Sequence, residues 1–115
     1  MESILTSIKK LIGLTEEYKV YDPDIIIHLN STFMILRQLG VGPEDGFIIE
    51  DENSFWTDFI PADNKLFEGV KTYVYARARL IFDPPQSSIV KECLEKTVAE
   101  FEWRLKEEAE LQADK

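Results

Sequence analysis

The stretch YVYARARLIFDPP, residues 73 to 85, decides how this chain folds. Its dense apolar residues are typical of a helix, and the two prolines that follow cannot continue one. Proline lacks the backbone N–H and disfavours helical geometry in the residue before it. We therefore expect a helix over Lys65 to Phe82, a stiff corner at Pro84 and Pro85, and a second amphipathic helix over Ser88 to Gln112.

Apolar spacing predicts which face of each helix is buried. In the first helix the face comprises Phe67, Val70, Val74, Ala78 and Ile81. In the second it comprises Val90, Leu94, Val98, Phe101 and Leu105. The first helix is apolar over more than half its circumference, so its own domain or a neighbouring subunit should surround it. The apolar stripe thins after Leu105, which predicts a domain over residues 1–105 and a charged tail over 106–115. The tail either frays or orders only on docking to a partner.

Local start and stop signals predict two helices upstream. Ser3 is a suitable N-cap for a helix to Ile12, and Asp22 with Pro23 opens another over Asp24 to Leu39. The glycine-rich segment that follows predicts a loop.

Two structures compete within that loop. One is a brief helix over Phe55 to Ile60 capped by Ser54, which we favour; the other is a hairpin with Phe47 to Glu50. The fold class expected is mainly α: a compact bundle of about four helices, with an irregular loop or short β-hairpin between the second and third.

Composition indicates one small acidic domain. The chain has 115 residues, 44% of them hydrophobic, and a net charge of -9. Residues 44–68 hold eight acids against Lys65, a net of -7, whereas residues 69–90 carry +2. This distribution argues against a nucleic-acid binder that grips phosphates, which needs clustered lysine and arginine. It suits repelling or guiding DNA better.

The cysteine count and the lengths of the apolar runs indicate the redox compartment and whether the chain enters a membrane. The one cysteine, Cys93, cannot form an intrachain disulfide, which favours a reducing compartment. We expect neither a signal peptide nor a membrane span, because no cleavage site follows the first apolar residues and no apolar run approaches the roughly 20 residues that a bilayer requires.

The residues that could carry chemistry do not form a recognisable set. His28, the only histidine, lies among apolar residues with no nucleophile in a suitable context, so a partly buried or flanking position is expected. The acids of the loop lack the alternation of a calcium site, and its glycines lack the lysine of a phosphate loop. We predict no catalytic residue, metal or cofactor, and no enzyme activity.

The arginines and tryptophans allow two interpretations. Arg79 could pair with Asp83 four residues on, or Arg77 and Arg79 could reach a carboxylate of a neighbouring subunit. Trp56 and Trp103 could belong to the core, which the physics of the residues favours, or anchor an interface.

Five stretches, in this order, resemble one known family. They are YDPDIIIHLNSTF (21–33), LGVGPEDGF (39–47), WTDF (56–59), YVYARARLIFDPPQSS (73–88) and FEWRL (101–105). Together they resemble the head-tail connector, or adaptor and head-completion, proteins of tailed bacteriophages and prophages of Gram-positive hosts. RLIFDPP followed by EWRL is the strongest part of the resemblance.

The resemblance implies a virion structural protein at the head-tail interface, assembled in the cytoplasm of the bacterial host. It implies an all-helical ring, usually of twelve copies, that binds the portal protein, extends the DNA channel and meets a downstream stopper or tail-completion protein. DNA would pass without specific binding.

The resemblance also suggests roles for the charged and aromatic residues in a ring. The expected subunit or portal interface comprises Arg77, Arg79, Asp83, Trp56, Trp103 and Arg104. The expected acidic loop beside the DNA channel comprises Glu50, Asp51 and Glu52. The alternative function is a small acidic helical regulator or DNA mimic that binds a basic protein partner.

Overall fold

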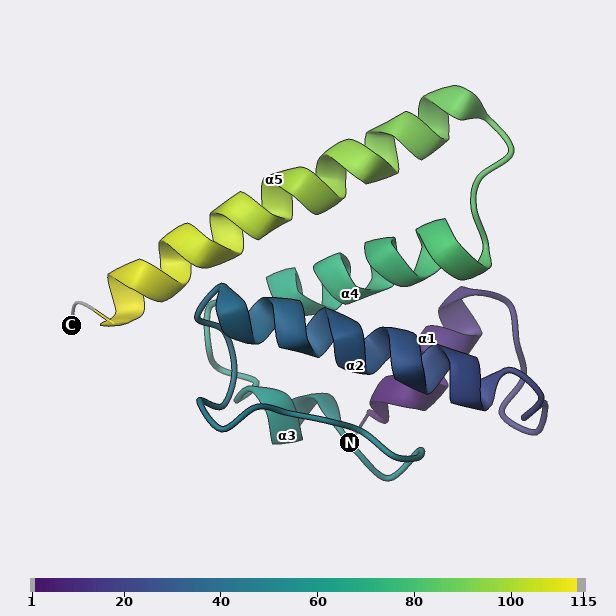
Figure 1. Cartoon of the computed structure of the whole chain (residues 1–115), viewed down its shortest axis with the longest axis horizontal. Helices are drawn as coiled ribbons and strands as arrows, with labels where there is room; N and C mark the ends of the chain where they lie inside the picture. Colours follow the sequence, from purple (N-terminus) through teal and green to yellow (C-terminus); the bar gives the residue numbers. More distant parts are fainter. Residues whose placement is uncertain (1, 114–115) are drawn as a thin grey trace.

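The computed structural model describes residues 2–113, and they form a flat helical bundle (Figure 1). The helices are α1 (Ile4–Leu11), α2 (Asp22–Gln38), α3 (Trp56–Phe59), α4 (Phe67–Phe82) and α5 (Ser88–Ala113). The described residues contain no β-strand, and the molecule measures 43 × 35 × 21 Å. The predicted mainly α bundle is confirmed.

The predicted helix ends are right at α1 and need one correction at α2. The Ser3 hydroxyl accepts a hydrogen bond from the Thr6 N–H at 3.3 Å, as an N-cap should. Asp22 does not cap α2: the helix already begins at Asp22, and Tyr21 occupies the N-cap position. The Asp22 carboxylate instead lies 2.9 Å from the ammonium of Lys9, which is buried at the end of α1.

The segment between α2 and α4 contains a short helix, and the hairpin alternative is wrong. Residues 47–50 form no strand; the only bridge among residues 2–113 joins Ser3 to Phe55. Ser54 is not the cap of α3, because Phe55 occupies the N-cap position. The Ser54 carbonyl accepts the N–H of Ile4 at 3.0 Å. The Phe55 N–H instead donates to the Asp58 carboxylate at 2.8 Å, which fixes the first turn of α3.

The loop is held in place by side chains on both sides. The amide of Asn30 on α2 accepts from the Ile49 N–H at 2.8 Å and donates to the Ile49 carbonyl at 3.1 Å. Phe33 contacts the rings of Phe47 and Phe59, with centroids 5.1 and 4.8 Å apart. The loop therefore packs against the core through Phe47 and Ile49.

Helix α4 is the central element, as its apolar circumference predicts. It packs against α1, α2 and α5 and buries Val70, Tyr73, Val74, Ala76 and Ala78. Ile81, predicted on the buried face, is 55% exposed. The other helices do not extend far enough to cover it.

Helix α5 is packed along only part of its length. Leu105 and Ala109 are its buried residues, whereas Ile89 and Val90 near its start are 74% and 44% exposed. The predicted burial of Val90 is therefore wrong. Figure 1 shows the first turns of α5 leading away from the bundle, so we call residues 88–94 the arm.

The C-terminal half of α5 packs closely on α4 because of Gly69. A Cβ atom at Gly69 would lie 3.2 Å from the Leu105 side chain, which would have to shift by a few tenths of an ångström to admit it. Helix α5 continues as far as Ala113, through most of the segment predicted as a separate tail. Residues 114–115 of that segment lie outside the described residues.

Candidate docking surfaces

Contacts between Arg79 and Asp83 hold the corner after α4. The N–H of Asp83 donates to the Arg79 carbonyl at 2.9 Å, which ends the helix before Pro84. The guanidinium of Arg79 lies 3.9 Å from the Asp83 carboxylate, and both side chains are partly exposed. An exposed pair of this kind contributes at most a few tenths of a kcal/mol, so both groups can still meet a partner.

Arg77 lies between three helices, not on an open surface. Its guanidinium is 3.7 Å from the Glu102 carboxylate of α5 and 3.4 Å from the Thr32 hydroxyl of α2. It also lies over the Tyr73 ring, and the Tyr73 hydroxyl donates to Glu102 at 2.6 Å. We call Thr32, Tyr73, Arg77 and Glu102 the polar cluster, and it ties α5 to α2 and α4.

Burial shifts the pKa values of two groups in and beside the cluster. Burial raises the pKa of the Tyr73 phenol, and its hydrogen bond to Glu102 acts in the same direction. Burial, assisted by the charge of Arg77, lowers the pKa of His28 to about 4. The half-buried His28 ring stands edge-on to Phe82, with centroids 5.6 Å apart. No group of three or more histidine, cysteine, aspartate or glutamate side chains that could hold a metal ion lies among residues 2–113.

The two tryptophans have opposite environments. Trp56 is 2% exposed, and its indole N–H donates to the Ser7 hydroxyl at 2.9 Å, so it stabilises the domain from within. Trp103 is 64% exposed on α5. Beside it the Arg104 guanidinium pairs with Glu100 at 2.8 Å, also on the surface. Trp103 and Arg104 are therefore available to a partner in the isolated chain, and Trp56 is not.

A groove of about 460 Å³ runs beside Trp103, between α5 and the start of α4. Apolar and charged side chains both line it; the lining includes Lys65, Phe101, Trp103, Arg104, Glu107 and Leu111. Exposed tryptophan and arginine next to a groove are what interface anchors look like.

The acidic loop lies on the opposite side of the molecule from the arm (Figure 1). Glu50, Asp51 and Glu52 are all exposed, and Asp51 accepts the N–H of Asn53 at 2.8 Å in a tight turn. None of the eight acids in residues 44–68 forms an ion pair within the part of the chain described. The loop therefore presents uncompensated negative charge to whatever faces it.

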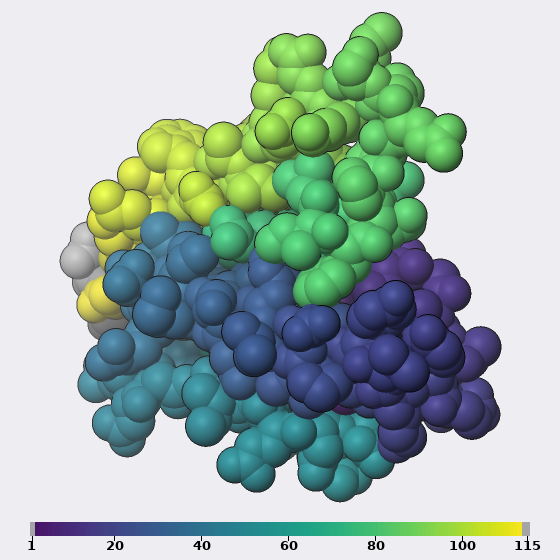
Figure 2. Space-filling model, turned by 45° about the vertical axis from the view of Figure 1, so that its right-hand side comes forward, coloured from purple at the N-terminus to yellow at the C-terminus, as the bar shows by residue number. Residues whose placement is uncertain are grey.

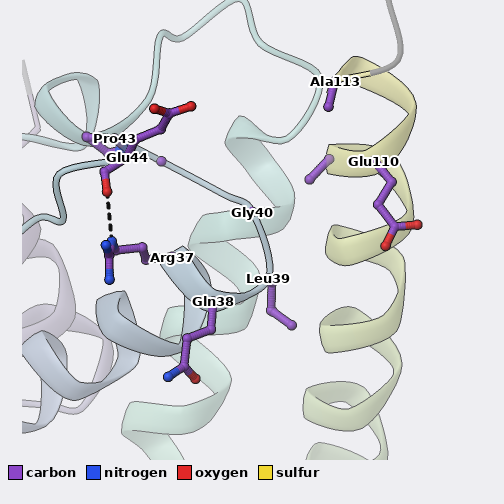
Figure 3. A pocket seen from close by; sticks show the side chains of 10 residues that line it. Arg37, Gln38, Leu39, Gly40, Pro43, Glu44, Glu110 and Ala113 are labelled. Carbon is purple, nitrogen blue, oxygen red and sulfur yellow. Dashed lines mark hydrogen bonds between the residues drawn. The ribbon is translucent and has the colours of Figure 1, made fainter.

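A second hollow, of about 410 Å³, lies between the end of α2 and the end of α5 (Figure 3). The Arg37 guanidinium donates to the Glu44 carbonyl at 2.8 Å on one side of it, and Ala113 and Glu110 stand on the other. The contact fixes the turn after α2, and nothing in the lining converges on a ligand.

A family model described as phage connector protein matches residues 4–112, nearly the whole chain. The chain belongs to this family. Searches of curated proteins and of solved structures found no match. Membership makes this connector a phage structural protein and a component of the virion that contacts other head or tail proteins. No helix in residues 2–113 is both long and apolar enough to cross a membrane.

The connector's polar cluster was not predicted in full. Arg77 was proposed for a subunit contact, and the structure places it against Thr32, Tyr73 and Glu102 of its own chain. The spacing of Tyr73 and Arg77, four residues apart on one helix, was an available signal. Nothing local pointed to Glu102, because its position depends on how α5 returns across α4.

Proposed function

We propose that this connector assembles as a ring on the portal, with the twelve copies that the family resemblance implies. The ring extends the DNA channel and joins head to tail. The observation that carries the proposal is the match of the connector family model over residues 4–112. A flat domain 21 Å thick with an exposed tryptophan, Trp103, on its surface supports it. A ring repeats one heterologous contact, so such a domain needs two different faces.

Within this proposal the exposed residues take the contacts. Trp103 and Arg104 meet the portal or the next copy, and Arg79 and Asp83 at the corner add charged partners. Arg77 holds α5 in position beneath these exposed residues through its contact with Glu102. The downstream stopper or tail-completion protein binds the opposite end of the ring.

The acidic loop lies beside the DNA channel in the proposed ring. Fixed negative charge repels phosphates and avoids the release of counterions that would make DNA stick. Glu50, Asp51 and Glu52 are exposed without an ion pair within residues 2–113, which leaves them free for this role.

The test is to mix purified connector with rings of the portal protein from the same phage and to measure the mass of the complex. The proposal expects a discrete complex with many connector copies on each portal ring. A connector that ignores the portal and instead captures a single basic host protein would favour the acidic regulator.

Trp103→Ala and Arg104→Glu should each weaken portal binding at least about tenfold, as anchor residues do. The matched control is Lys10→Glu, the same reversal of charge at an exposed position of α1. Equal binding by all the variants would remove Trp103 and Arg104 from the interface.

A further inference from the structure

The outer side of α2 and the loop beside it carry exposed apolar side chains. Ile27 and Met34, seven residues apart on the helix, are 66% and 53% exposed, and Ile48 of the loop is 67% exposed. A hollow of about 380 Å³ lies between the helix and the loop, and its lining includes Ser31, Met34, Phe47 and Ile48. We call Ile27, Met34, Ile48 and this hollow the α2 surface.

Negative charge flanks the α2 surface. Asp24 lies one turn before Ile27, and Glu44 and Asp45 come directly before the loop residues that line the hollow. These three acids are exposed and form no ion pair within residues 2–113. Arg37 is the one cation among the described residues of the lining, and it donates to the Glu44 carbonyl at 2.8 Å. Three carboxylates against one guanidinium leave a net charge of -2.

The arm has the complementary character. Ile89 and Val90 are 74% and 44% exposed at its start, and Lys91 is exposed without an ion pair in the described part of the chain. Glu92, the acid of the arm, lies 3.5 Å from the ammonium of Lys96. The first turn of α5 contains no acid, so the positive end of this 26-residue helix stays uncompensated. The arm therefore presents apolar groups and positive charge together.

One copy cannot bring the arm to its own α2 surface. Figure 1 shows the arm at the free end of α5, whereas the loop after α2 runs along the opposite side of α2 from α5. Figure 2 shows the arm standing clear of the molecule. A contact between the two needs a second copy, and it is heterologous because the two surfaces consist of different residues.

We propose that the arm of each copy lies on the α2 surface of the next copy, with Ile89 in the hollow and Lys91 beside Glu44 and Asp45. A heterologous contact can repeat around a closed ring. The inference therefore rests on the proposed ring, and it identifies the segments that join the copies. Residues 50–52 are not part of the lining of the hollow, so they stay free to face the DNA channel.

The first test is disulfide trapping of the connector on portal rings, in a Cys93→Ser background. The double variant Ile89→Cys with Met34→Cys should oxidise to a ladder of linked copies, because every copy carries both halves of the contact. The two single variants mixed should give a product of two copies and nothing larger, and each alone should stay monomeric. The matched control is Ile89→Cys with Leu11→Cys, since Leu11 is 49% exposed on α1, and it should give no ladder.

The outcomes separate this contact from the proposed ring. A ring on the portal without the ladder would overturn the arm contact and leave the ring standing. If the connector does not bind the portal, trapping of the concentrated connector alone decides the contact: a ladder supports it although the proposed ring fails, and no ladder overturns it. A covalent dimer of the Ile89→Cys variant alone would show arm meeting arm, which also overturns it.

Charge exchange gives an independent readout. Lys91→Glu sets a carboxylate against acids, so the connector concentration that half-fills the portal ring should rise at least about tenfold. Adding Asp45→Lys to that variant should recover most of the loss, because Lys91 and Asp45 meet only between copies. Lys10→Glu, the same reversal at an exposed position of α1, is the control and should leave that concentration unchanged. No recovery with Asp45→Lys would contradict the proposed contact.

Discussion

At the scale of single residues, the hydrogen bond between Tyr73 and Glu102 links the centre of α4 to the centre of α5. Tyr73→Phe removes the donor and should lower the free energy of unfolding by about 0.5 to 1.5 kcal/mol. Urea denaturation measures the loss. Tyr18→Phe, at an exposed position of the α1–α2 segment, is the control and should change the free energy of unfolding little. Equal losses in the two variants would contradict a stabilising role for the hydrogen bond between Tyr73 and Glu102.

His28 makes stability depend on pH. Its pKa is about 4 in the folded chain against 6.5 in a free side chain, so the unfolded chain binds the proton first as the pH falls. The contribution of neutral His28 is complete above pH 6.5 and is lost progressively between pH 6.5 and 4.

For a half-buried side chain we expect that loss to be about 1 to 2 kcal/mol. The measurement is the free energy of unfolding against pH for the wild type and for His28→Gln. The difference between the two curves should shrink toward pH 4, whereas parallel curves would refute the assignment.

At the scale of elements, the turn after α2 depends on a glycine in two ways. Gly42 has a φ of +93°, which favours glycine, and an added Cβ atom would overlap the Phe59 ring. Gly42→Ala should therefore destabilise the fold by about 2 to 4 kcal/mol, from strain and displacement of a core ring. Thermal unfolding measures this loss.

The matched control for Gly42 is Gly13→Ala. Gly13 has a similar φ of +89°, but no atom lies within 4 Å of the added Cβ, so only the strain of about 1 kcal/mol remains. Equal melting temperatures for the two variants would show that Phe59 moves away without cost.

Local signals and long-range packing explain what the sequence could and could not predict. The prolines after Phe82 and the cap at Ser3 act within one turn of helix, and both helix ends were predicted correctly. Ile81 and Val90 were placed on buried faces, because periodicity identifies a face but not how far a neighbouring helix covers it. Their exposure depends on how far the neighbouring helices extend, which no local pattern records.

At the scale of the whole molecule, the acidic loop is proposed to face the DNA channel. Reversing two charges, Asp51→Lys with Glu52→Lys, should slow DNA ejection more than it reduces the yield of particles, because lysines attract the phosphates that pass. Both side chains are exposed, so folding should be unaffected. Ejection kinetics of purified virions measure the effect, and normal ejection would place the loop away from DNA.

The central claim is that this chain joins the phage head to its tail as a ring on the portal. The most direct measurement is a cryo-electron microscopy reconstruction of the junction in intact virions. The account predicts a ring of this helical domain directly below the portal, with residues 44–68 toward the channel. Virions whose junction lacks the chain, or that carry it as an isolated copy elsewhere, would contradict the account.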